Sequence, residues 1–218
     1  MEQTSATPSL DIGRCLNEAL DVYRKNFFTF VLAAILFSMM SLFSLFVLAG
    51  PLWGGIVLMT LNAMRHPERK ADIGDLFRAF DRFGELVAVF FITAIPIIVG
   101  YMLFIVPGVL LSALWLFPTY LIVDQRMSVG DALTTSWKLV LRRGLMINML
   151  AAFVIFALTA GAGIVPYLGI ILGWLIAPIA WMVNTSAYVQ EVKERSDITD
   201  FAPRGFPVVP PVGATPAT

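Results

Sequence analysis

Side chains that could act as acids, bases, nucleophiles or metal ligands are few in this chain of 218 residues. Its single histidine, His66, has no second ligand beside it in the sequence, so no metal site is expected there. Its single cysteine, Cys15, excludes an intramolecular disulfide and is expected to pack on the apolar face of a helix. Glu85 and Asp124 are the carboxylates nearest to the long apolar segments. Each is expected either in water at a helix end or paired with an arginine.

Sequence motifs for common enzyme chemistry are missing. The chain has no phosphate-binding Walker loop, zinc signature, nucleophile elbow or dinucleotide fingerprint. A charged residue within a membrane span would indicate a proton or ion pathway, and none lies inside the apolar segments, since Glu85 and Asp124 are at their ends. We therefore expect neither an enzyme nor a cofactor. Basic and acidic residues number 15 each, so the net charge gives no reason to expect nucleic acid as a partner.

Uncharged polar side chains do occur within the apolar segments. Asn148 and Asn184 are expected to join helices through hydrogen bonds, each contributing about 1 kcal/mol. Alternatively, they would line a ligand cavity together with the serine-containing face of residues 38–44. A stripe of small residues at every fourth position allows two helices to pack closely: Gly169, Gly173 and Ala177.

These residues are expected to lie on membrane helices. The chain is 58% hydrophobic and only 14% charged, whereas soluble domains have about 25% charged residues. The uncharged segment 27–64 is too long for one span of about 20 residues. Gly50-Pro51 is therefore expected to divide it into a hairpin. Segments 85–123 and 145–187 predict two further hairpins.

A polar segment precedes each hairpin and predicts an amphipathic helix along the membrane surface. In residues 10–26, apolar side chains recur at spacings of three and four. The second helix is expected to start at Asp72, with Asp75 in its first turn. The third is expected to be capped by Ser128, with Asp131 in its first turn.

The three units share motifs in the same order, which predicts an internal repeat. A hydrophobic residue followed by glycine opens each surface helix, and a proline follows each hairpin tip: Pro51, Pro107 and Pro166. We predict an all-α membrane protein with six transmembrane helices, as three repeated units of an interfacial amphipathic helix and a transmembrane hairpin. The predicted segments are a disordered N-terminus (1–9), a six-helix membrane domain (10–189), its units (about 10–64, 71–123 and 128–187), and a proline-rich, disordered cytoplasmic tail (190–218).

Basic residues lie only in the polar segments and never at the hairpin tips. Under the positive-inside rule, this places both termini on the cytoplasmic side of the inner membrane. Three basic pairs flank the hairpins and are candidate contacts for anionic lipid head groups: Arg24, Lys25, Arg78, Arg82, Arg142 and Arg143. The alternative is that these residues only determine the topology.

Several short motifs, taken in order, resemble a known group of proteins. They are Tyr23-Arg24-Lys25-Asn26-Phe27, Gly50-Pro51-Leu52-Trp53-Gly54-Gly55, Asp75-Leu76-Phe77-Arg78-Ala79-Phe80, Val106-Pro107-Gly108-Val109 and Asp131-Ala132-Leu133-Thr134-Thr135-Ser136. Over residues 9–190 the chain is similar to bacterial membrane proteins of the YciC-like type and the related glycerophosphoryl diester phosphodiesterase membrane domain. The resemblance implies a six-helix membrane fold and a lipid context. It implies no catalytic residues, and the phosphodiesterase domain of some members has no counterpart in residues 1–218.

Two functions are compatible with these predictions. The leading one is a non-catalytic accessory subunit or scaffold that organises the membrane, with lipids, other membrane proteins or further copies of the chain as partners. The alternative is a module that binds or transports a lipid or a small apolar molecule. The first predicts a protein partner at fixed stoichiometry, and the second predicts a cavity between the hairpins.

Overall fold

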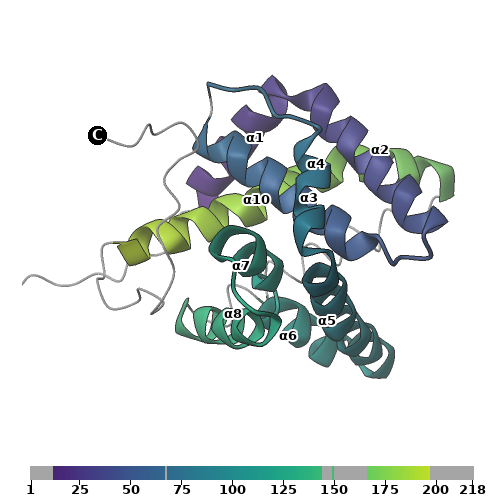
Figure 1. Ribbon diagram of the computed structural model, residues 1–218, viewed down its shortest axis with the longest axis vertical. Helices are drawn as coiled ribbons and strands as arrows, with labels where there is room; N and C mark the ends of the chain where they lie inside the picture. The colour runs from purple at the N-terminus through teal and green to yellow at the C-terminus, as the bar shows by residue number, and fades with distance from the viewer. Residues whose placement is uncertain (1–11, 67, 144–148, 150–165, 197–218) are drawn as a thin grey trace, which may run out of the picture.

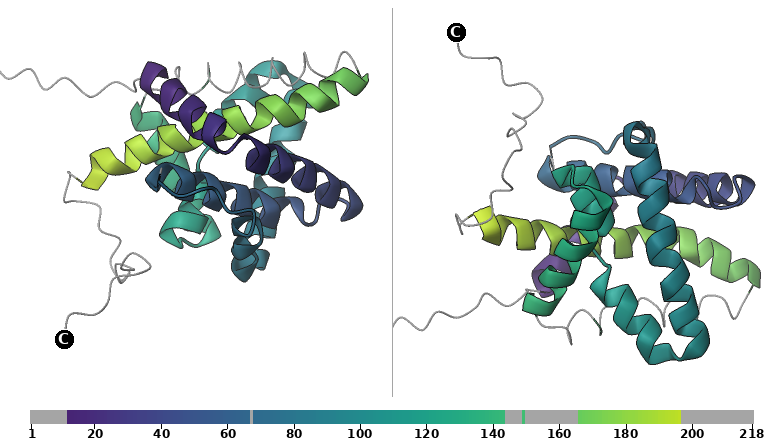
Figure 2. Two further views of the ribbon diagram at one scale, coloured as in Figure 1. Left: turned by 90° about the horizontal axis from the view of Figure 1, so that it is seen from above. Right: turned by 60° about the horizontal axis from the view of Figure 1, so that its bottom comes forward.

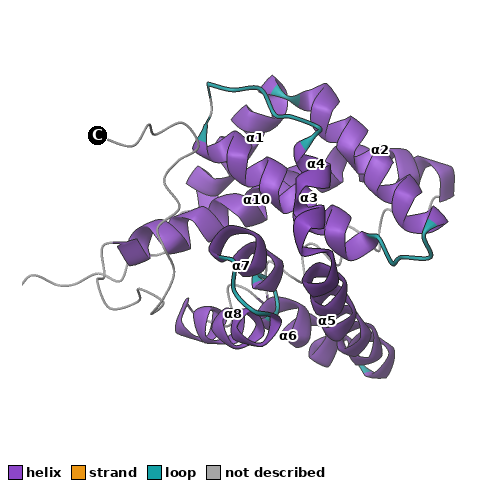
Figure 3. Cartoon of the chain, in the orientation of Figure 1, coloured by secondary structure: helices purple, strands orange, loops and turns teal. Residues whose placement is uncertain are grey.

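The computed structural model describes residues 12–66, 68–143, 149 and 166–196, and helices and loops make up these ranges (Figure 3). The fold class is all-α, as predicted. In chain order the elements are α1 (Ile12–Lys25), α2 (Phe27–Phe43), α3 (Ala49–Arg65), α4 (Asp75–Arg78), the 3-10 helix η1 (Ala79–Arg82), α5 (Phe83–Leu103), α6 (Ile105–Leu114), α7 (Pro118–Gln125), α8 (Val129–Arg143) and α10 (Pro166–Ser196).

Three helical segments are long and apolar enough to cross a membrane. They are Asp75–Leu103, Ile105–Gln125 and Gly169–Gln190. The end of α1 and the whole of α2 would together make a fourth, but they are bent by 90°. α3 has 17 residues, or about 26 Å, which is less than the hydrocarbon thickness of about 30 Å. The described residues thus support a membrane protein with three candidate spans, and they do not establish six.

α3 is the central helix of the fold. Most of its residues are buried, and it packs against α2, α4, α5, α7 and α10. Around it, α10 runs the length of the body and α5 crosses the direction of α10 steeply (Figures 1 and 2). A Cβ atom at Gly55 would lie 1.9 Å from the carbonyl oxygen of Leu76, and one at Gly50 would lie 2.3 Å from that of Leu86. The backbone of α4 and of the start of α5 therefore lies directly against α3.

The two described hairpin turns are short and apolar. Phe104 alone separates α5 from α6, whereas residues 44–48 join α2 to α3. Leu45 and Phe46 have left-handed backbone conformations, with φ of 50° and 64°. Leu45 and Met102 are each 83% exposed. Such side chains suit contact with lipid better than contact with water.

The position of the first turn corrects one prediction. The chain reverses at residues 44–48, and Gly50-Pro51 already belongs to α3. The reason is that proline is tolerated in the first turn of a helix, where its missing N–H has no partner to lose. Pro107 likewise falls in the first turn of α6, and Pro166 begins α10. Each tip proline therefore opens the helix that follows, as predicted.

Two of the three predicted surface helices are present as helices, α1 and α8. α1 meets α2 at 90°, so a membrane crossed by α2 would have α1 along its surface. α8 starts with Ser128 as a side-chain cap, as predicted. The Ser128 hydroxyl accepts from the backbone N–H of Asp131 at 3.3 Å and donates to the Asp131 carboxylate at 2.7 Å.

The prediction of the second surface helix is wrong, because no single helix forms there. A single turn, α4, and the 3-10 helix η1 take its place and lead directly into α5. Asp72 accepts from the N–H of Gly74 at 2.8 Å, which stabilises a turn in place of a helix start. Asp75 and Leu76 are buried against α3. The inward orientation of these two residues is the physical reason for the difference.

The three surface segments pack on three different apolar helices. α4 and η1 pack on α3, α8 packs on α7, and α1 packs on α10. The second and third segments thus pack on the helix that precedes them in the chain. The first packs on the last described helix.

Candidate functional site at a polar junction

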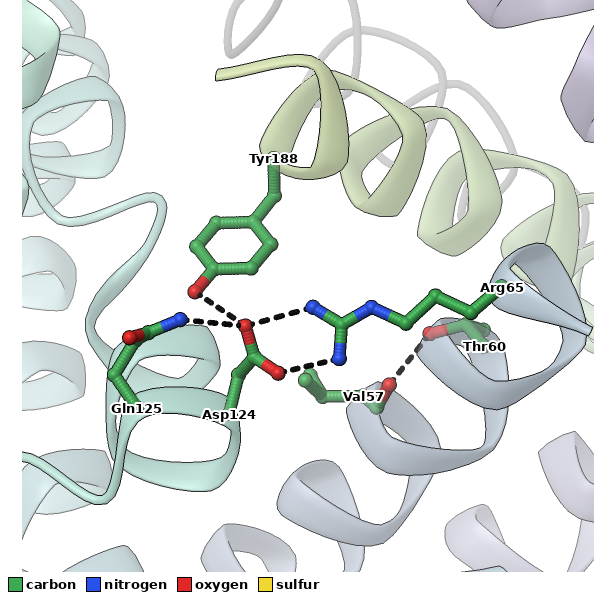
Figure 4. A network of polar contacts seen from close by, with 6 residues as sticks. All are labelled: Val57, Thr60, Arg65, Asp124, Gln125 and Tyr188. Atoms are coloured by element: carbon green, nitrogen blue, oxygen red, sulfur yellow. Dashed lines mark hydrogen bonds and ion pairs between the residues drawn. The ribbon is translucent and has the colours of Figure 1, made fainter. Parts of the chain in front are cut away.

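Polar side chains from α3, α7 and α10 meet in one place between these helices (Figure 4). Each of the three helices belongs to the segment that follows one of the predicted hairpin tips. We call this set the polar junction, and its members are Thr60, Arg65, Tyr120, Asp124, Gln125, Thr185 and Tyr188.

The Asp124 carboxylate is the centre of the polar junction. Arg65 donates to it from two nitrogens, at 2.6 and 2.8 Å, in a bidentate pair. The Tyr188 hydroxyl and the Gln125 amide both donate to Oδ2 of Asp124 at 3.0 Å. The Asp124 side chain is 8% exposed and that of Arg65 is 41% exposed. A buried anion is thus balanced by a cation that still reaches solvent.

A second set of hydrogen bonds continues the polar junction between the same helices. The Thr185 hydroxyl donates to that of Thr60 at 2.8 Å, and the Thr60 hydroxyl donates to the carbonyl of Val57 at 2.9 Å. The Tyr120 hydroxyl lies 3.2 Å from that of Thr185. If Tyr120 donates, every hydroxyl in the series has an acceptor, and Thr185 and Thr60 are also within reach of the carbonyls of Trp181 and Ile56. The series links α7 to α10 and α10 to α3.

Aromatic rings surround these hydrogen bonds. The rings of Tyr120 and Tyr188 pack with their centroids 5.1 Å apart, and Phe117 lies against both. Both tyrosines are fully buried, because their hydroxyls have partners on neighbouring helices.

Smaller polar contacts tie the surface segments to the apolar helices. Asn62 on α3 donates to the Asp75 carboxylate at 2.8 Å. Ser186 on α10 donates to the carboxylate of Glu18 on α1 at 2.9 Å. Ser136 on α8 donates to the carbonyl of Leu114 at 2.8 Å. Each of these contacts crosses between segments that also pack through apolar side chains.

The carboxylates singled out from the sequence are both paired with arginine, as predicted. Glu85 forms an ion pair with Arg82, three residues earlier. Asp124 pairs with Arg65, which lies 59 residues away in sequence. The sequence offered one signal for the second pair, since Arg65 and Asp124 each end an apolar run and have opposite charges. The hydroxyl series had no comparable signal, because threonines are common in apolar helices.

The six predicted head-group contacts have different surroundings. Arg24 and Lys25 are exposed at the end of α1. Arg78 is bound to Asp75 at 2.6 Å, and Arg82 is held by Glu85 and by a backbone carbonyl. The two at the end of α8 have side chains outside the described residues: Arg142 and Arg143.

The predicted helix-packing residues lie mainly outside the polar junction. Asn148 is outside the described residues, as is most of the first arm of the third predicted hairpin. Asn184 is half-buried in α10. No described atom lies within 4 Å of a Cβ built at Gly173, and Gly169 and Ala177 are half-buried. Close packing along this stripe stays a prediction.

The side chains of the polar junction are arranged to hold helices together. Its carboxylate already accepts four hydrogen bonds, one of them from Tyr188, and its other three hydroxyls are linked to one another. Among the described residues, no three histidine, cysteine, aspartate or glutamate side chains are grouped to hold a metal ion. No known family model matches the chain, and no curated protein or solved structure is significantly similar to it.

Proposed function

We propose that this chain is an integral membrane scaffold or accessory protein with no catalytic activity of its own. The observation that carries the proposal is the saturated polar junction. The Asp124 carboxylate accepts from Arg65, Gln125 and Tyr188, which leaves it little capacity for a substrate. Groups paired in this way hold helices in a fixed arrangement. A rigid helical body in the membrane is what a scaffold requires.

In this proposal the chain has six spans in three units, and both termini and the surface helices are on the cytoplasmic side of the inner membrane. Two observations support this topology. The 90° bend between α1 and α2 fits a surface helix followed by a span. The turns around Leu45 and Phe104 expose large apolar side chains and no charge. Kinship with the YciC-like proteins is part of the same proposal.

The exposed apolar surfaces suit lipid and membrane-protein partners. Large apolar side chains are exposed on the outer faces of α2, α5 and α10. In a bilayer these faces would contact acyl chains, other spans or a second copy of the chain. Nothing in this arrangement requires nucleic acid.

The test is extraction of a tagged copy from native membranes in mild detergent, followed by native mass spectrometry of the intact particle. We expect a defined mass containing a second membrane protein, or further copies of this chain, at a fixed ratio. A protein removed from membranes by alkaline carbonate would contradict the membrane assignment. A single chain that releases a small apolar molecule on denaturation would instead favour the binding or transport function.

A further inference from the structure

We infer that the corner between α1 and α2 binds the phosphate head group of an anionic lipid. The inference rests on the membrane location proposed above. The site consists of four basic residues from two segments: Arg24 and Lys25 at the end of α1, and Arg69 and Lys70 in the loop between α3 and α4. We call these four residues the basic corner.

The geometry of α1 and α2 sets the depth of the basic corner. The two helices meet at 90°, with Asn26 as the single residue between them. If α2 enters the bilayer, α1 lies along its surface, and the residues at the bend lie at the level of the lipid head groups. Lys25 directly precedes the bend and Arg24 precedes Lys25.

Asn26 also holds the second segment in place. Its side-chain oxygen accepts from the backbone N–H of Ala71 at 2.9 Å, and its amide nitrogen donates to the carbonyl of Val22 at 3.1 Å. Ala71 and Ile73 pack against the apolar cluster that contains Val22. The loop from α3 to α4 therefore passes beside the junction of α1 and α2 (Figure 1). Because Lys70 directly precedes Ala71, this contact brings the two basic segments together.

The four cations of the basic corner are free to bind an anion. All four are exposed, and none forms an ion pair with the described residues. Of the three acids in the same segments, Glu68 lies 3.4 Å from the His66 ring and Asp72 accepts from the N–H of Gly74. The third of these acids is Asp21, which lies one turn before Lys25 in α1. In contrast, Arg78 is already bound to Asp75.

An apolar surface continues from the basic corner along α2. Phe28 is 85% exposed and Leu32, one helical turn further, is 48% exposed. A cationic site at head-group depth, directly followed by an exposed apolar helix face, matches a ligand with an anionic head and acyl chains. This is why the ligand is a lipid and not free phosphate.

The experiment is a lipid titration of the full chain in mild detergent, read by native mass spectrometry. The probes are phosphatidylglycerol and phosphatidylcholine, with glycerol 3-phosphate as a competitor. We expect preferential binding of phosphatidylglycerol that millimolar glycerol 3-phosphate does not displace. Each basic residue near a membrane surface contributes about 1 kcal/mol, or about fivefold in affinity. Lys25→Gln with Lys70→Gln should therefore weaken phosphatidylglycerol binding by about 25-fold.

The matched control removes two exposed cations elsewhere, with Arg126→Gln and Lys138→Gln. It should change binding less than threefold. A second corner pair, Arg24→Gln with Arg69→Gln, tests the same site in case the first pair fails to fold. Both double variants should have the same unfolding temperature as the unmodified protein.

Equal effects of the corner and control pairs, or equal binding of the two lipids, would overturn the inference. Displacement by glycerol 3-phosphate would show a phosphate site without lipid selectivity, which also overturns it. Resistance to carbonate extraction is measured separately, so failure of the membrane assignment is distinguishable from failure of lipid binding.

Discussion

At the scale of single residues, the two partners of the ion pair in the polar junction are unequal. Asp124 is buried, whereas Arg65 retains access to solvent. Removal of the carboxylate leaves an arginine that water can reach, and removal of the arginine leaves a buried anion. The second situation is the more costly, because a buried unpaired charge loses its hydration without compensation.

We therefore predict that Arg65→Met destabilises the protein more than Asp124→Asn does. The expected losses are about 3 kcal/mol for Arg65→Met, close to the cost of breaking a buried pair, and about 1 kcal/mol for Asp124→Asn. Thermal unfolding in detergent, followed by tryptophan fluorescence, measures both. The double variant Arg65→Met with Asp124→Leu should regain part of the stability, because it leaves no unpaired charge. Equal losses in the two single variants would contradict this account of the polar junction.

A second residue-scale prediction concerns the tether of the loop before α4. Asn26→Ala removes the acceptor for the N–H of Ala71 and should cost about 1 to 2 kcal/mol. The loop should then open more often, so trypsin should cleave after Arg69 and Lys70 faster than in the unmodified protein. Gln125→Ala is the control, since it also removes one side-chain amide but lies in α7. Unchanged cleavage in Asn26→Ala would show that the apolar contacts of Ala71 and Ile73 suffice to hold the loop.

At the scale of elements, the contact between α3 and α4 depends on glycine. We predict that Gly55→Ala is strongly destabilising, by about 3 kcal/mol or more, because its Cβ would overlap the backbone of Leu76 and α4 cannot give way locally. Gly84→Ala is the matched control. A Cβ at Gly84 meets nothing within 4 Å, and alanine favours a helix by up to about 1 kcal/mol over glycine. Thermal unfolding of both variants tests this, and a Gly55→Ala protein as stable as Gly84→Ala would contradict the close contact.

The sequence predicted elements better than it predicted their contacts. Apolar runs, the tip prolines and the cap at Ser128 depend on local chemistry, and they predict α1, α2, α3, α5, α6, α7 and α8. The second surface helix failed because burial of Asp75 and Leu76 on α3 is a tertiary effect that overrides the local pattern. The polar junction was missed because its members lie on three helices far apart in sequence. The opposite charges of Arg65 and Asp124 at two helix ends allow an ion pair, but they do not identify the other members of the polar junction.

At the scale of the whole molecule, the topology proposed above can be tested by cysteine accessibility. Cys15→Ser gives a background without cysteine. In inverted membrane vesicles, we expect Lys70→Cys to react rapidly with a membrane-impermeant maleimide and Phe104→Cys to remain unlabelled. Lys138→Cys on α8 serves as a second cytoplasmic control. Labelling of Phe104→Cys as fast as Lys70→Cys would place the α5–α6 turn in water on the cytoplasmic side and contradict the topology.

The packing of α1 on α10 has a consequence for how the protein is made. The hydrogen bond between Glu18 and Ser186 joins residues 168 positions apart, whereas α4 and α8 pack on helices synthesised just before them. During synthesis, α1 can pack on α2 and α3 soon after they form, but its larger contact with α10 must wait until residues 166–196 have been made. Biogenesis should therefore include a late closure step, in which α10 completes the packing around α1. Until that step, α1 exposes the surface that α10 will cover, and this interval is when a chaperone or insertase would be needed most.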